Sequence, residues 1–243
     1  MVTIGVDVAS QPNGTAACWI RWRDGRATVQ SVEQSIADDR LRSILPEEPA
    51  VKVGVDVPLG WPTAFVQALT AHHAGAQWPP VSTRKLVRRV TDWHVHESVG
   101  QLPLSVSTDR IAYAAMRVAA LLPGTIDRRG DQRVVEVYPA AALRRWLLPW
   151  QRYKGSGRLV GLEELVKALR DVTKTWLVAG QAEWSRLAGN DDLFDALVAS
   201  LIARAKVLGL CEPVPPEQNE AARAEGWIAL PMTGSLDELP RAR

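Results

Sequence analysis

Two short apolar runs in the chain end in the same tetrapeptide, Gly-Val-Asp-Val. The runs cover residues 2–8 and 51–57, are rich in Val, and lead into polar or Pro-containing segments. Runs of this length and composition are typical of buried β-strands. Each carries one acid, Asp7 or Asp56, and a carboxylate taken out of water must be paired, bound to a metal or protonated. Two equivalent acids on two buried strands predict one shared site.

The apolar and polar pattern of the remaining chain predicts further elements. Strands are expected at 15–23 and 27–33, joined by an Asp24-Gly25 turn, and at 133–138, with a candidate last strand at 226–230. Helical spacing predicts helices at 38–45, 63–73, 108–122, 140–147, 162–178 and 191–207. In the helix at 63–73, Phe65, Val66 and Leu69 are expected to lie on one face. Residues 74–106 are expected to form an irregular basic insertion.

The order of these elements favours one fold. Three hairpin-linked strands, a helix, a strand and then alternating helices with a further strand are the opening order of an RNase H-like fold. We therefore expect a single α/β domain over residues 1–243, with helices on both faces of a mixed five-stranded sheet, a β-meander followed by parallel strands. Sites in such sheets form at the carboxyl ends of adjacent parallel strands. Asp7 and Asp56 lie near those ends, and Gly5 and Gly54, two residues earlier on the same strand faces, would leave room beside the carboxylates.

Three more acids extend this candidate site. Glu136 lies inside the apolar run 134–138, and Asp192 and Asp195 are three residues apart on nearly one face of the last helix. So many carboxylates cannot all ionise in one place without compensation. Oxygen ligands without His or Cys favour Mg²⁺ or Mn²⁺. Other roles stay open, because Glu136 can pair with a buried arginine, and Asp192, like Asp191, can be a first-turn acid.

Basic residues supply candidate contacts for phosphate groups. Lys154 lies in the loop at 153–155, and a cluster within 74–106 consists of Arg84, Lys85, Arg88 and Arg89. Such side chains hold nucleic-acid backbones, and for the cluster the alternative is a solvated helix face.

Composition narrows the class of protein. The 243 residues are 47% hydrophobic and 23% charged, which is ordinary for a globular protein, and the net charge of +2 neither requires nor excludes nucleic acid as a partner. The two cysteines form no disulfide framework or zinc pattern. Without a leader sequence or an apolar stretch that could cross a bilayer, we expect a cytoplasmic protein with no membrane partner.

The motifs together resemble the DUF429 family, a domain of unknown function described as predicted RNase H-like nucleases. The matching pieces are Ile4-Gly5-Val6-Asp7, Gly54-Val55-Asp56-Val57-Pro58-Leu59-Gly60, Arg88/Arg89-x-Thr91-Asp92, Val135-Glu136-Val137-Tyr138-Pro139 and Asp192-x-x-Asp195-Ala196. The resemblance spans nearly the whole chain. It implies that Asp7, Asp56, Asp192 and Asp195 are metal ligands, with Glu136 a further part of this family's own pattern.

These observations favour a metal-dependent nuclease acting on DNA or RNA. Its carboxylates, with Glu136 as a further catalytic candidate, would hold two cations about 4 Å apart that activate water and stabilise the leaving oxygen. One alternative is a small-molecule kinase or ATPase of the related actin-like fold, in which Asn13-Gly14-Thr15 would be the phosphate loop. Another is a non-catalytic binding module that keeps its acids for structure.

Overall fold

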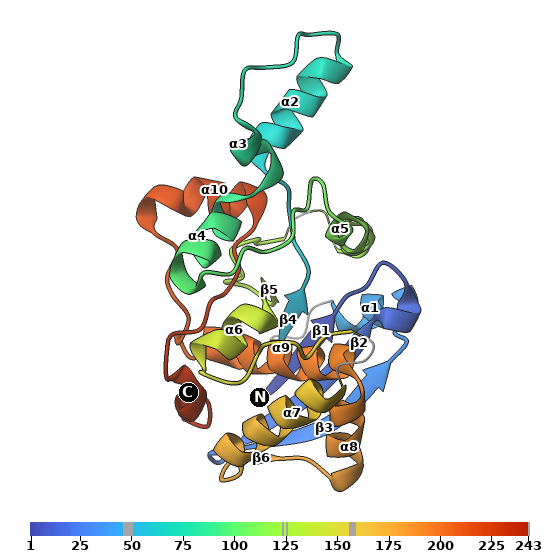
Figure 1. Cartoon of the computed structure of the whole chain (residues 1–243), viewed down its shortest axis with the longest axis vertical. Coiled ribbons are helices and arrows are strands. Elements are labelled where there is room, and N and C mark those ends of the chain that lie inside the picture. The colour runs from blue at the N-terminus through green and yellow to red at the C-terminus, as the bar shows by residue number, and fades with distance from the viewer. Residues whose placement is uncertain (46–50, 123, 125, 156–158, 243) are drawn as a thin grey trace.

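The computed structural model describes residues 1–45, 51–122, 124, 126–155 and 159–242. A twisted sheet is covered by helices, and a helical arm extends away from it (Figure 1). The strands are β1 (Val2–Asp7), β2 (Ala16–Arg23), β3 (Arg26–Gln34), β4 (Val51–Asp56), β5 (Val134–Glu136) and β6 (Leu177–Val178). The helices are α1 (Asp38–Ile44), α2 (Thr63–His73), α3 (Thr83–Val87), α4 (Val90–Val99), α5 (Ile111–Leu121), α6 (Pro139–Arg145), α7 (Leu159–Thr173), α8 (Gln181–Gly189), α9 (Asp191–Val207) and α10 (Asn219–Glu225). No helix in the described part of the chain is long and apolar enough to cross a membrane.

The sheet is mixed, with strand order β5-β4-β1-β2-β3-β6. Strands β1, β2 and β3 form the predicted antiparallel meander, and β4 and β5 continue the sheet parallel to β1. In the hairpin between β2 and β3, Asp24 and Gly25 both have positive φ, 52° and 73°, as a two-residue turn requires. The described sheet has six strands rather than the expected five, because β6 adds to the edge at β3. With only two residues, β6 has no periodicity that could reveal it.

Several predicted boundaries and element assignments are wrong. The helix expected at 162–178 ends at Thr173, and β6 and α8 follow it. The segment 226–230 makes one isolated bridge, between Ile228 and Glu136, rather than a strand. The segment 74–106, expected to be irregular, contains α3 and α4. By contrast, α2 and α9 have the predicted bounds.

The arm shows why helical periodicity alone can mislead. Helix α2 and the chain leading to α3 extend away from the sheet (Figure 1). Val66 and Leu69 of α2, predicted to share one face of the helix, are exposed, and Ala68 is the residue of this helix that is buried. The apolar spacing correctly predicted the helix, but no sheet lies beneath the face that carries Val66 and Leu69.

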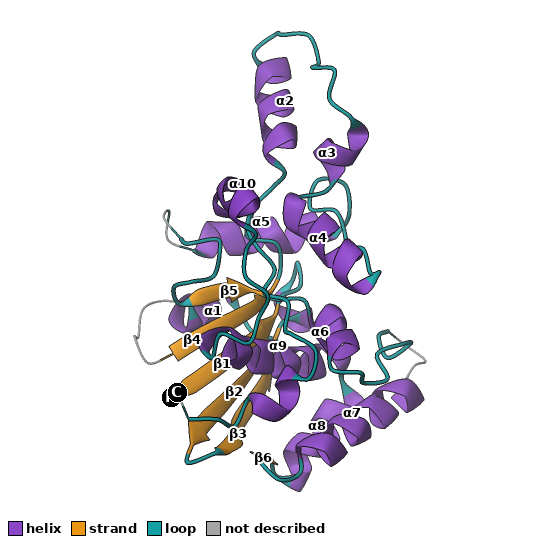
Figure 2. Ribbon diagram, turned by 90° about the vertical axis from the view of Figure 1, so that its left-hand side faces the viewer, coloured by secondary structure: helices purple, strands orange, loops and turns teal. Residues whose placement is uncertain are grey.

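Helices cover both faces of the sheet, as predicted (Figure 2). Ile4, Val6 and Val8 pack in one apolar core with residues of α1 and α5. The other core contains residues of α6, α7, α8 and α9. Because side chains alternate along a strand, Thr3, Gly5 and Asp7 of β1 point toward α9. The Thr3 hydroxyl lies 2.8 Å from that of Ser200 on this helix.

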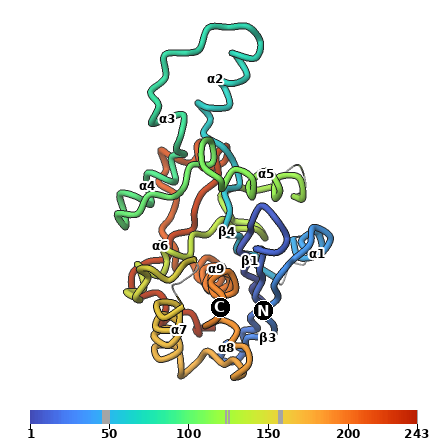
Figure 3. Tube along the Cα trace, turned by 45° about the vertical axis from the view of Figure 1, so that its right-hand side comes forward, coloured from blue at the N-terminus to red at the C-terminus, as the bar shows by residue number. Residues whose placement is uncertain are grey.

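Helix α9 lies unusually close to the sheet at β1 and β4 (Figure 3). A Cβ atom added to Gly5 would lie 1.9 Å from the backbone oxygen of Ala196, and one added to Gly54 would lie 2.4 Å from that of Ala199. The two glycines therefore make room for the helix backbone. The expectation that they leave space beside the carboxylates is corrected, because α9 occupies that space.

Candidate functional site

Asp7 and Asp56 are direct neighbours at the ends of two parallel strands. The register pairs Gly5 with Gly54 and Asp7 with Asp56. Parallel strands lie about 4.8 Å apart, so both aspartates begin from adjacent backbone positions and point to the same face. The predicted convergence of Asp7 and Asp56 is confirmed.

Helix α9 brings further acids to this pair. The Asn190 side chain caps the helix by accepting a 2.8 Å hydrogen bond from the backbone N–H of Leu193. With this start, Asp195 lies one turn into the helix and is 1% exposed, while Asp192 is half-buried. Both carry charges that act on the Asp7 carboxyl. Asp191 has a separate role, because its carboxylate accepts a 2.9 Å hydrogen bond from the backbone N–H of Gly155.

A lysine and a tyrosine from the loop before α7 contact the carboxylate of Asp195. The Lys154 ammonium forms an ion pair with the Asp195 carboxylate. The Tyr153 hydroxyl donates a 2.8 Å hydrogen bond to Oδ1 of the same group. Lys154 thus lies at the carboxylates, in contact with an acid of the site. The Tyr153 contact was not anticipated, since its only sequence signal is its neighbour Lys154.

Burial and mutual repulsion make these carboxylates hard to ionise. Burial raises the pKa of Asp56 to about 7; Lys154 opposes this rise and Asp195 adds to it. The pKa of Asp7 is raised well above its ordinary value by burial and by Asp56, Asp195 and Asp192, against the effect of Lys154. Burial and Asp191 raise the pKa of Asp192 to about 6. One ammonium therefore balances only part of the charge that four carboxylates would carry.

Glu136 has an arginine partner, the alternative left open by its sequence. The guanidinium of Arg89 donates to both oxygens of Glu136, at 2.8 and 2.7 Å, and to Oδ1 of Asp92 at 2.9 Å. The backbone N–H of Leu59 adds a 3.0 Å bond to Glu136. Arg89 is 1% exposed. Its assignment as a phosphate contact is corrected, because its guanidinium is enclosed and bound to two carboxylates.

The other predicted cations do not form one patch with Arg89. Arg84 is exposed, stacks over the ring of Trp93 at 3.5 Å and lies 3.8 Å from Glu97. Arg88 is mostly buried and lies 3.5 Å from Asp109. The structure therefore separates residues that the sequence had grouped as one basic cluster.

The candidate phosphate loop is folded on itself. The Thr15 hydroxyl accepts hydrogen bonds from the backbone N–H of Ala9 at 3.2 Å and from Arg117 at 2.7 Å. It donates to the carbonyl oxygen of Gln11 at 3.1 Å. These contacts engage the Thr15 hydroxyl within the protein, so the loop offers no support for the kinase alternative.

The donor chemistry at Asp7, Asp56, Asp192 and Asp195 suits a hard divalent cation, because all four are carboxylates. Within the described residues, however, no three His, Cys, Asp or Glu side chains are already arranged to hold an ion. Asp195 is instead paired with Lys154. The residues present fit such a cation in charge and ligand type, and Asp195 would have to exchange its contact with Lys154 for one with the ion.

Comparison with known proteins places the chain in a family. No curated protein and no solved structure matches it. A family model described as "Protein of unknown function (DUF429)" matches residues 5–220, which include all the acids discussed above. With most of its length matched, the chain belongs to the DUF429 family.

Proposed function

We propose that the chain is a metal-dependent nuclease that hydrolyses phosphodiester bonds in DNA or RNA. The observation that carries this proposal is the direct pairing of Asp7 with Asp56, with the acids of α9 acting on the same group. The meander β1–β2–β3, continued by β4 and β5 parallel to β1, supports the RNase H-like assignment of the fold.

Asp7, Asp56, Asp192 and Asp195 would hold Mg²⁺ or Mn²⁺. A cation bound there would act as a Lewis acid on the phosphate and lower the pKa of a bound water. The surplus of negative charge favours such an ion, because it would relieve the repulsion that raises the pKa values of Asp7 and Asp56.

Lys154 would exchange its partner in this reaction. Its ammonium now neutralises Asp195, but 47% of its side chain is exposed, so it can leave the carboxylate without disrupting a packed core. Released from Asp195, it would contact the phosphate of the substrate, the role predicted for it from the sequence. Tyr153 would keep Asp195 oriented through its hydroxyl.

Binding of the cation is tested first and without a substrate. We expect Mn²⁺ and Mg²⁺ to raise the melting temperature of the wild-type protein, and Asp7→Asn to remove most of this shift. Asp171→Asn is the matched control, since Asp171 is an exposed acid on α7. A shift that is equal in wild type and in Asp7→Asn would exclude this site as the cation site.

Cleavage is tested separately, with single-stranded, duplex and branched DNA and RNA in Mn²⁺. We expect at least one substrate to be cut. Asp7→Asn should reduce the cleavage rate by a factor of 100 or more, which corresponds to a loss on the order of 3 kcal/mol in transition-state stabilisation. Absence of cleavage of every substrate, or equal cleavage by wild type and Asp7→Asn, would overturn the assignment of nuclease activity to this site.

A second candidate function is supported by the Lys154–Asp195 ion pair itself. If the ammonium is a permanent counter-ion, the chain is a binding module without catalysis. This alternative predicts that Mn²⁺ does not raise the melting temperature of wild type, and that wild type, Asp7→Asn and Asp171→Asn respond alike. The nuclease proposal requires the opposite result.

A further inference from the structure

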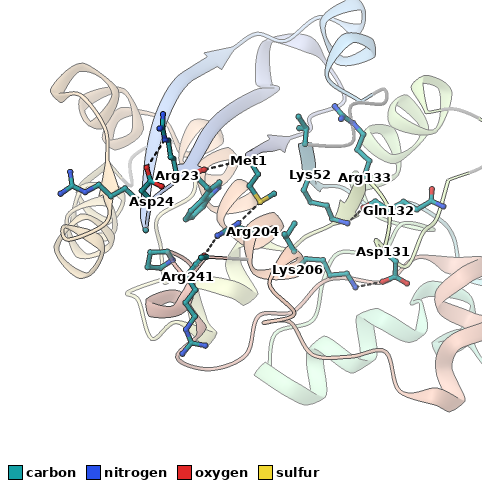
Figure 4. A pocket seen from close by; sticks show the side chains of 17 residues that line it. Met1, Arg23, Asp24, Lys52, Asp131, Gln132, Arg133, Arg204, Lys206 and Arg241 are labelled. Carbon is teal, nitrogen blue, oxygen red and sulfur yellow. Dashed lines mark hydrogen bonds and ion pairs between the residues drawn. The ribbon is translucent and has the colours of Figure 1, made fainter.

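A second charged region lies at the opposite end of the sheet. It is a cavity of about 740 Å³, formed where β1 and β4 begin and where α9 ends (Figure 4). The hairpin between β2 and β3 lines it on one side, and residues 131–133 line it on another. A volume of this size is in the range of pockets that hold small molecules.

This cavity is separate from the carboxylates. Met1 and Val51 line it, whereas Asp7 and Asp56 end the same two strands. Five residues of strand place Val2 about 17 Å from Asp7. Helix α9 spans both regions, with its acids at the amino end and Lys206 at the end that lines the cavity.

The lining is strongly basic. Seven of its residues are Arg or Lys and two are Asp. This is an excess of five positive charges, whereas the whole chain has an excess of only two. Positive charge is therefore concentrated at this cavity, and the rest of the chain carries more acids than bases. A concave surface lined by one sign of charge focuses its field on a ligand of the other sign.

Lys52 brings a positive charge to a nearly buried position in this lining. It is 7% exposed, and its ammonium donates to the carbonyl oxygens of Gly130, at 2.5 Å, and of Gln132. Both acceptors are uncharged. Burial and the neighbouring Lys206 lower its pKa to about 8, while Asp131 and Asp127 oppose this. An anion bound beside Lys52 would favour its charged form.

Further cations face the cavity from different elements. Lys206 of α9 lies 3.0 Å from Asp131. Arg23 and Arg26 flank the hairpin turn, both exposed, and Arg23 lies on the far side of the cavity from Lys52 and Lys206 (Figure 4). Cations on separate walls suit a ligand with several negative groups rather than one.

We propose that this cavity binds a polyphosphate group, either free or carried by a nucleoside. Arg and Lys are the side chains that bind phosphate oxygens, and their placement on separate walls of one cavity suits a chain of phosphates better than a single one. The proposal does not depend on the nuclease activity, since the cavity shares no residue with the carboxylate site.

The test is titration calorimetry of the full chain, without divalent metal or chelator, using tripolyphosphate, ATP, a single-stranded oligonucleotide and, at matched ionic strength, sulfate. We expect saturable binding of one tripolyphosphate per chain, at least tenfold tighter than sulfate. The double variant Arg26→Gln/Lys206→Gln should weaken it at least tenfold. The control variant Lys167→Gln/Lys174→Gln removes the same charge from exposed positions of α7 and the residues after it, and should bind as wild type does.

The outcomes separate the ligands. ATP binding tenfold tighter than tripolyphosphate assigns the site to a nucleoside polyphosphate, and equal affinities assign it to the phosphates alone. Absence of saturable binding, an equal loss in the control variant, or binding of a single-stranded oligonucleotide but not of tripolyphosphate would overturn the proposal. Asp7→Asn should bind tripolyphosphate with the same affinity as wild type, so this result does not depend on the proposed nuclease activity.

Discussion

Two groups of buried charges lie near the same end of the sheet and differ in how they are balanced. In one group, Arg89 donates to Glu136 and Asp92 through three bonds of 2.9 Å or less. In the other, Asp7, Asp56 and Asp195 share the ammonium of Lys154. The first group sets one guanidinium against two carboxylates and makes well-formed bonds to both, whereas the second sets one ammonium against four carboxylates and keeps the larger surplus of negative charge.

This difference separates a structural ion pair from the candidate cation site. Glu136 and Asp56 give the same signal in the sequence, an acid inside an apolar strand. The fixed guanidinium beside Glu136 leaves it no need for a ligand, and its carboxylate ties β5 to α4. The acids around Asp56 still lack charge compensation. Surplus charge, rather than burial alone, marks the candidate cation site.

The largest expected effect comes from removing the cation of the first group. Arg89→Met leaves Glu136 and Asp92 buried without their cation, so we expect the free energy of unfolding to fall by about 3–5 kcal/mol. Urea denaturation followed by circular dichroism measures this. Arg84→Met, at an exposed arginine, should stay within about 0.5 kcal/mol of wild type. A loss below 1 kcal/mol for Arg89→Met would refute the structural role.

A methyl group at Gly5 should disturb the other group. Its Cβ would lie 1.9 Å from backbone oxygen of α9, so the helix that carries Asp195 must move. We expect a loss of about 3 kcal/mol in the free energy of unfolding, together with a weaker Mn²⁺-linked shift in melting temperature. Gly189→Ala is the control, because nothing lies within 4 Å of the added methyl group. Equal stability of the two variants would contradict the close packing.

Removing one surplus charge should stabilise the protein without metal. The pKa of Asp56 is raised to about 7, above its unfolded value near 4, so the folded state holds the proton more tightly. Stability therefore falls as pH rises from about 4 to 7, and Asp56→Asn removes this loss. We expect a gain on the order of 1–2 kcal/mol at pH 8 that disappears by pH 4, measured by urea denaturation at each pH.

The neighbouring acid Glu136 should respond in the opposite direction. Glu136→Gln turns an amide N–H₂ toward the guanidinium of Arg89, so this variant should be less stable than wild type at pH 8. A stabilising Glu136→Gln, or a destabilising Asp56→Asn, would remove the distinction between the two groups.

Removing Lys154 tests whether its ammonium competes with a divalent cation. Lys154→Gln leaves the buried Asp195 carboxylate without its cation, so we expect the free energy of unfolding to fall by about 1–2 kcal/mol, less than for Arg89→Met because the half-exposed Lys154 position admits water. If ammonium and divalent cation compete for Asp195, the same variant should show a larger Mn²⁺-linked shift in melting temperature than wild type. A smaller shift than in wild type would mean that Lys154 supports cation binding instead of competing with it.

Local sequence determined much of the fold. The Asp24-Gly25 turn, the helix bounds of α2 and α9 and the meander follow from turn chemistry and periodicity, which act over a few residues. The repeated Gly-Val-Asp-Val also predicted the pairing of Asp7 with Asp56, because equal strands in a parallel sheet align equal positions. Neither the two-residue β6 nor the exposed face of α2 left such a local signal.

Only the tertiary structure decided which charges meet. Arg89 and Glu136 are 47 positions apart, and Lys154 and Asp195 are 41 apart, so no local pattern could pair them. The packing of α9 against Gly5 and Gly54 is also a contact between distant parts of the chain. The missing side chains of these glycines leave room for the backbone of α9, which no local pattern could reveal. Periodicity reports which face of an element is apolar, but the partner of a buried charge depends on how distant elements pack.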